Sequence, residues 1–219
     1  MGVEGNFKGE TSLYYLTHFF SKEHLSSVGK TLWKWWAASF AIIVAAYLIT
    51  YFVDPDVKKA MNSIRNALSV TGGKESYWEG TFTIFKNNWV VCLQILILSI
   101  IPIPFLYTYS LILTNALIGV VVYLSQKAGL GLVHTILAGL LPHAVLEIST
   151  FIVAIYYGRK INKIIVGKII NKLRSKKKDI PPLWKQIKET FIIFICVITP
   201  AIFLAAFIEG YLSRFLLNY

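Results

Sequence analysis

Residues His134 to Tyr157 read HTILAGLLPHAVLEISTFIVAIYY and form a long apolar run. At roughly 20 residues per crossing, it is long enough and apolar enough to span a bilayer. Within it, His143 and Glu147 stand one helical turn apart, so both side chains lie on one helix face. A carboxylate at bilayer depth costs a few kcal/mol and is rarely left without a partner or a purpose. These two residues are therefore the first candidates for a functional site.

The rest of the chain shares this apolar character. Of its 219 residues, 56% are hydrophobic and 15% are charged, and the mean hydropathy is +0.60. Soluble domains carry about 25% charged residues. We therefore predict an all-α polytopic membrane helix bundle with about five transmembrane helices. A cytoplasmic amphipathic segment, residues 1–32, precedes a membrane domain that comprises residues 33–219.

The apolar runs and their interruptions predict where the chain crosses the membrane. The predicted spans are residues 37–53, 88–101, 105–124, 132–157 and 190–211, with an extracellular loop at 54–87. Pro102 and Pro104 predict a turn, and Pro200 predicts a kink in the last span. Pro142 interrupts the fourth span, because proline removes a helical hydrogen bond and disfavours helix just before it. That span is either one kinked helix or a re-entrant half-helix over 132–141 followed by a second piece.

The positive charge is concentrated in one segment. The net charge is +11, and eleven of the 22 lysines and arginines lie between Arg159 and Lys188, where Asp179 is the only acid. Beside membrane spans, such a cluster indicates a cytoplasmic loop facing anionic lipid rather than a nucleic-acid site. The basic segment, residues 158–188, is therefore expected in the cytoplasm. With five spans, this puts the N-terminus in the cytoplasm and the C-terminus outside.

After Gly158 the pattern is that of a basic amphipathic helix lying on the inner leaflet. Its apolar positions are Ile161, Ile165, Ile169 and Leu173. The residues expected to bind anionic lipid headgroups are Lys163, Lys168, Lys172 and Arg174.

The polar residues at membrane depth are few, and isolated helices cannot satisfy them, so they should converge inside the bundle. The predicted polar intramembrane cluster comprises Asn88, Asn115, His143, Glu147 and Glu209. Three interpretations stay open. The side chains hold helices together, or they conduct a proton or an ion, or His143, Glu147 and Glu209 bind a catalytic zinc with one open position. No residue is assigned as catalytic beyond these three candidates, and no other cofactor is expected.

Several short motifs, in order, resemble the stage II sporulation protein M family over roughly residues 80–215. They are Phe85-Lys86-Asn87-Asn88, Asn115 with Gly119, Pro142-His143 with Glu147, and Ala205-Ala206-Phe207-Ile208-Glu209. The family usually has Asn-Gly and Pro-His-Gly, and here Ala116 and Ala144 replace those glycines. Close helix contacts at these two points are therefore expected to differ.

The resemblance implies five spans and a role as a membrane partner. The sporulation member of the family holds peptidoglycan-degrading enzymes together during engulfment. Relatives occur in circular-bacteriocin gene clusters and are linked to maturation, export or immunity. We therefore expect a non-enzymatic component of a bacterial cell membrane that assembles with other membrane proteins. The alternative is a metal-dependent intramembrane enzyme that hydrolyses or ligates a peptide substrate, or a proton-coupled transporter, using His143, Glu147 and Glu209.

Overall fold

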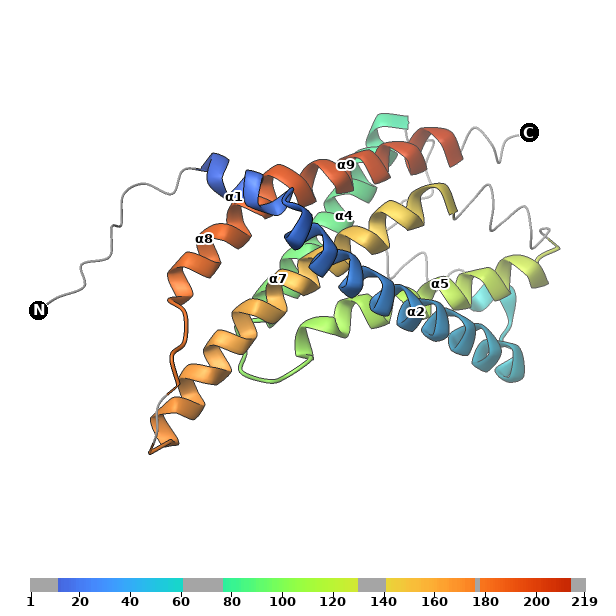
Figure 1. The fold of residues 1–219 in the computed structure, drawn as a ribbon. Helices are drawn as coiled ribbons and strands as arrows, with labels where there is room; N and C mark the ends of the chain where they lie inside the picture. Colours follow the sequence, from blue (N-terminus) through green and yellow to red (C-terminus); the bar gives the residue numbers. More distant parts are fainter. Residues whose placement is uncertain (1–11, 61–76, 130–140, 176–177, 214–219) are drawn as a thin grey trace, which may run out of the picture.

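The computed structural model describes residues 12–60, 77–129, 141–175 and 178–213, and all regular structure among them is helical (Figure 1). The α-helices are α1 (Ser12–Phe19), α2 (Lys22–Val53), α4 (Tyr77–Leu98), α5 (Tyr109–Lys127), α7 (Leu141–Leu173), α8 (Leu183–Ile193) and α9 (Thr199–Phe207). A 3₁₀ turn, η1 (Leu106–Thr108), precedes α5, and two π-helical stretches, η3 (Phe194–Ile198) and η4 (Ile208–Ser213), flank α9.

Among the residues that the structure describes, four helical segments are long and apolar enough to cross a membrane, which confirms the predicted membrane helix bundle. They are Lys22–Val53, Tyr77–Leu98, Leu106–Lys127 and Leu183–Gly210. The predicted number of five transmembrane helices was approximate, and the described residues contain four such segments. The remaining long helix, α7, is not among these segments. Its described residues carry Glu147 and, from Arg159 onward, basic side chains.

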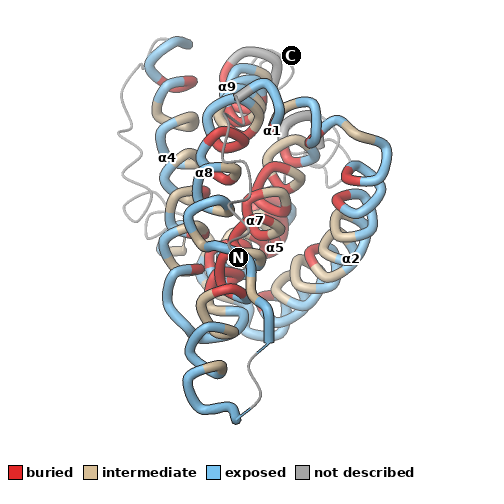
Figure 2. The backbone as a smooth tube through the Cα atoms, turned by 60° about the vertical axis from the view of Figure 1, so that its left-hand side comes forward, coloured by how far each residue is buried: buried red, intermediate tan, exposed pale blue. Residues whose placement is uncertain are grey.

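Helix α7 is the centre of the bundle and packs against α2, α4, α8 and α9. Figure 2 shows buried positions on α7, which run from Ala144 to Ile164, while the outer faces of α2 and α4 are exposed. Five of the largest fully buried side chains belong to α7: Ile148, Phe151, Ile152, Ile155 and Tyr157. Burying a side chain of this size contributes about 1.5–3 kcal/mol in water. Inside a bilayer, close packing of such side chains stabilises the helix bundle instead.

Two helices begin earlier than hydropathy predicted. Helix α2 starts at Lys22, where the Ser21 hydroxyl accepts a hydrogen bond from the His24 backbone at 3.3 Å and caps the helix. The expected N-terminal amphipathic segment is thus divided between α1 and the first turns of α2. Helix α4 starts at Tyr77 rather than near Asn88. A 32-residue helix such as α2 is about 48 Å long, so it extends beyond a hydrocarbon core of about 30 Å.

The predicted fourth span and the basic amphipathic helix after Gly158 belong to one continuous helix. Helix α7 continues through Gly158 to Leu173. A Cβ at position 158 would lie 3.2 Å from the Ser99 Cβ, so this glycine provides close contact with the end of α4. The predicted apolar face divides accordingly. Ile161 is buried, whereas Ile169 and Leu173 are exposed because α7 extends past the other helices there.

The prolines mark departures from regular helix. The chain turns over residues 99–105, and Phe105 adopts a left-handed φ of 65° before η1. In the last segment, Pro200 sits at the start of α9 directly after the π-helical η3. Proline lacks the N–H that would bond one turn back, and a π-helical stretch absorbs that missing bond.

Helices α2 and α5 run parallel along a common seam. Contacts along it advance in the same direction on both helices. Asn115 Nδ2 donates to Ser39 Oγ at 2.8 Å, and Tyr47 donates to Gln126 Oε1 at 2.5 Å. At the far end, Asp54 Oδ1 accepts hydrogen bonds from Tyr123, at 2.6 Å, and from Lys127.

This last contact predicts a pH dependence. Hydrogen bonds from Lys127 and Tyr123 hold the pKa of Asp54 below its ordinary value of 3.8. Because the folded-state pKa is depressed, the carboxylate's stabilisation is present above pH 3.8 and is lost as pH falls through the lower folded value. Hydrogen exchange at the C-terminal turn of α2 should therefore be slower in the wild type than in Asp54→Asn at neutral pH. Asparagine tolerates the left-handed φ of 49° found here, so the backbone is not newly strained.

The difference between the two proteins should close as the pH falls below 3.8 and through the lower folded-state pKa of Asp54. A constant difference across the titration would show that the carboxylate charge is not what holds this end of the seam.

Candidate functional site

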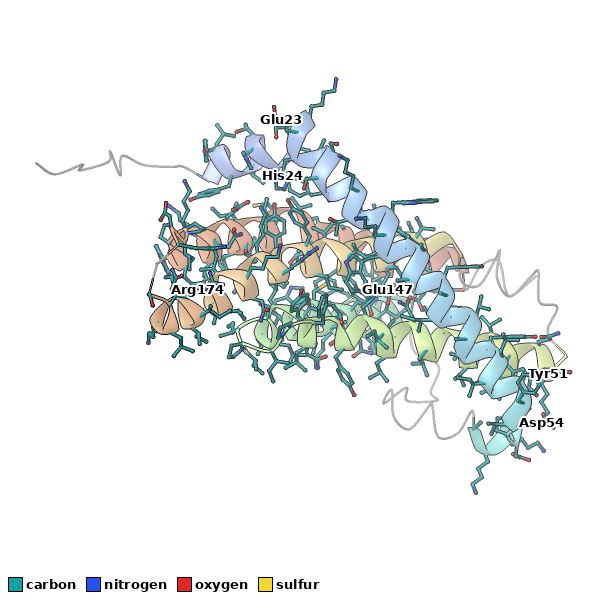
Figure 3. The ribbon with its side chains drawn as sticks, turned by 60° about the horizontal axis from the view of Figure 1, so that its bottom comes forward. Glu23, His24, Tyr51, Asp54, Glu147 and Arg174 are labelled. Carbon is teal, nitrogen blue, oxygen red and sulfur yellow. The ribbon has the colours of Figure 1, made fainter. Side chains whose placement is uncertain are left out.

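Three helical segments bring polar side chains together around Glu147. The Asn88 side chain of α4 hydrogen-bonds to the Glu147 carboxylate of α7, and Glu209 of η4 lies within electrostatic range of it. Glu147 and Glu209 are both partly buried. In Figure 3, Glu147 lies midway along the bundle, while Asp54 and Arg174 lie towards opposite ends. We call Asn88, Glu147 and Glu209 the carboxylate cluster.

The side of the cluster formed by α4 is closely packed. Cys92, one turn after Asn88, is fully buried and also lies within electrostatic range of Glu147. Nearby, a Cβ on Gly210 would collide with the Thr81 hydroxyl and come within 3.1 Å of the Thr81 Cα. Gly210 therefore allows η4 to approach α4 and sets the position of its neighbour Glu209. The π-helical geometry of η4 is a form often found at functional sites.

The Asn115 side chain is directed away from the carboxylate cluster and towards α2. Its amide nitrogen binds Ser39 of α2, and its oxygen is buried without a hydrogen-bond partner among the described residues. Gly119, one turn later, packs directly on the α2 backbone. Asn115 thus contacts α2, whereas Asn88, Glu147 and Glu209 are brought together. The side chain of His143 lies outside the described residues, although its backbone is in the first turn of α7.

Each acid of the carboxylate cluster influences the protonation of the other, and the Asn88 amide supplies a donor to Glu147. Within the part of the chain that the structure describes, no three His, Cys, Asp or Glu side chains group as metal ligands. The side chain of His143, the third predicted zinc ligand, lies outside the described residues. The zinc site therefore stays a prediction.

The predicted lipid-binding residues are all exposed, and they fall into two groups. Lys163 and Arg174 line a cavity beside α7, whereas Lys168 and Lys172 do not. The same cavity includes Arg159 and Asn162, which sequence reasoning did not single out. Asn162 is only 4% exposed and donates to the backbone oxygens of Ser99, at 3.1 Å, and Ile101, at 2.7 Å. In the sequence, Asn162 could be recognised only as an uncharged polar residue next to Ile161, on the helix face that the structure buries.

Comparison with known proteins gives one match. The family model described as Stage II sporulation protein M matches residues 33–214, which is most of the chain. No curated protein and no solved structure matches it.

Proposed function

The chain belongs to the stage II sporulation protein M family, and from that membership we propose that it is a non-catalytic membrane component that assembles with other membrane proteins. The setting is a bacterial cell membrane, in sporulation-type engulfment or in circular-bacteriocin maturation, export or immunity. Family membership and the four membrane-capable segments both fit a membrane protein.

The observation that carries this proposal is how the bundle uses its polar side chains. Several polar side chains outside the carboxylate cluster join one helix to another, while hydroxyls such as those of Thr50 and Thr150 bond within their own helix. Trp36 Nε1 of α2 donates to Ser149 of α7 at 3.1 Å, and Trp89 Nε1 of α4 donates to Thr199 of α9 at 3.2 Å. Together with the Asn115–Ser39 bond, these contacts each contribute about 1 kcal/mol in a membrane. They define a rigid helical frame, as a component that positions partners requires.

The distribution of charge supports a cytoplasmic N-terminus. The C-terminal half of α7, with its exposed cations, lies at the same end of the bundle as α1 and the start of α2. Tyr157 of α7 hydrogen-bonds to His24 at 3.0 Å, and Lys160 pairs with Glu189 of α8 at 3.4 Å. The positive-inside rule puts this basic end in the cytoplasm.

A second candidate function rests on the carboxylate cluster. Two acids and an amide gathered from three helical segments are more than packing requires, since one asparagine can satisfy one carboxylate. The cluster supports proton-coupled transport, or zinc-dependent peptide hydrolysis or ligation if His143 completes the site.

Glu147→Gln distinguishes the two functions, because it keeps shape and most hydrogen bonding while removing the charge. For a scaffold, crosslinking in native membranes should recover the same partner proteins with the variant as with the wild type. Stability should change by less than about 1 kcal/mol, since one of two like charges is removed. Glu23→Gln, the same change on an exposed position of α2, is the matched control.

The second function predicts a different result. Glu147→Gln, but not Glu23→Gln, should abolish proton flux into proteoliposomes or remove bound zinc while partner recovery stays normal. A wild-type protein that recovers no partner at all would contradict the scaffold proposal.

A further inference from the structure

A cavity of about 380 Å³ opens beside the C-terminal half of α7. Its walls are α7 itself, the turn before η1, and the segment that returns after α7. Arg174, which lines the cavity, lies at the end of the bundle in Figure 3. The cavity is far from the carboxylate cluster and takes no part in the proposed function.

Two asparagines and a glycine fix the walls. Asn162 joins α7 to the turn through its two backbone hydrogen bonds. Asn171 donates to the Lys178 backbone oxygen at 2.6 Å and accepts from the Lys178 N–H at 3.2 Å, which ties down the returning segment. A Cβ at Gly167 would lie 3.1 Å from Ile180 Cδ1, so the glycine lets that segment pack closely on α7. The cavity is therefore held by specific contacts at both sides.

The cavity is lined by cations. Arg159, Lys163 and Arg174 come from α7, and Lys178 comes from the returning segment. The first two stand one turn apart on the helix, so they share a face. None of the four forms an ion pair with another described residue, and Asp179 is the only acid in the lining. Four cations against one carboxylate create a site for an anion.

Apolar groups line the same cavity. Phe105, Val166 and Ile170 contribute to its wall, and Phe105 and Ile170 are 61% and 39% exposed. A ligand that fits both features has an anionic head and an apolar body. Basic pockets between helices at the cytoplasmic face of membrane proteins bind phosphate-bearing lipid headgroups for this reason. We propose that this cavity binds the headgroup of an anionic phospholipid, with Arg159, Lys163, Arg174 and Lys178 on the phosphate.

The test titrates dioleoyl phosphatidylglycerol into the purified full-length protein in detergent and counts bound lipids by native mass spectrometry. Each cation near anionic lipid contributes about a fivefold factor in affinity, so Arg159→Gln/Lys163→Gln should raise the half-occupancy concentration roughly 30-fold. The matched control is Lys22→Gln/Lys30→Gln, which makes the same charge change at two exposed positions of α2 outside the cavity. It should shift that concentration less than about twofold.

A further variant and two competing ligands test the same site. Lys178→Gln leaves the α7 sequence intact and should raise the half-occupancy concentration of the lipid about fivefold. This single variant tests the site even if the double variant misfolds. An equal effect of the two double variants would overturn the proposal in favour of a diffuse basic surface. Equal binding of dioleoyl phosphatidylcholine would remove the requirement for an anion. Displacement of the lipid by inorganic phosphate would make this a site for free phosphate instead.

Discussion

Gly119→Ala should lower the free energy of unfolding by about 1–3 kcal/mol, since overpacking a tight helix contact costs that much. The added Cβ would lie 2.8 Å from the Ala46 Cβ and 2.9 Å from the Tyr47 backbone nitrogen, and it would also collide with the Ile43 backbone oxygen. Two of these three atoms belong to the α2 backbone, so no rotamer change can make room. Helices α2 and α5 would have to move apart.

That movement should have a second consequence. Asn115 lies one turn before Gly119 on the same face of α5 and binds Ser39 of α2. Separating the helices lengthens this bond and leaves a fully buried amide without a partner, which adds to the cost of the overpacking. The free energy is measured by titrating dodecyl sulfate into mixed micelles while following helicity.

Gly29→Ala is the matched control. No atom lies within 4 Å of a Cβ added at Gly29, which is an exposed position of α2. Alanine is the better helix former by up to about 1 kcal/mol, so this variant should be neutral or slightly more stable. If both glycine variants destabilise equally, the loss at Gly119 does not come from contact with α2.

The class of fold follows from the sequence because a bilayer leaves few alternatives. Backbone groups in hydrocarbon must be satisfied within a segment, so long apolar runs predict helices without further information. Their ends are less well defined. Hydropathy reports the part of a helix that lies in hydrocarbon, and both α2 and α4 continue past it, to Lys22 and Tyr77.

The candidate site was harder to predict, because depth in the membrane does not fix which way a side chain points. Asn115 and Glu147 are both polar and both at depth, so the sequence placed them together. The rotation of α5 is set by Gly119, which packs on α2 and turns Asn115 towards Ser39. Asn162 was missed for a related reason. Its partners are backbone oxygens of a turn, and no sequence pattern marks them.

Asn162→Leu should lower the free energy of unfolding by about 2–3 kcal/mol. Leucine has nearly the shape of asparagine but no donor, so the oxygens of Ser99 and Ile101 lose their bonds. Removing one partner of a buried hydrogen bond costs about 1–3 kcal/mol, and two acceptors are affected here. Residue Ile101 is 38% exposed and its bond to Asn162 is only partly buried, so water can reach that end of the turn and reduces the total below twice this value.

Asn171→Leu is the control, because the Asn171 amide also donates to a backbone oxygen, that of Lys178, but at an exposed position. Water replaces the lost partner there, so the cost should stay below about 1 kcal/mol. The two variants make the same chemical change on one helix and differ in burial. Equal losses in the dodecyl sulfate titration would mean that the turn over residues 99–105 is not held by Asn162. The left-handed backbone at Phe105 would then need another support.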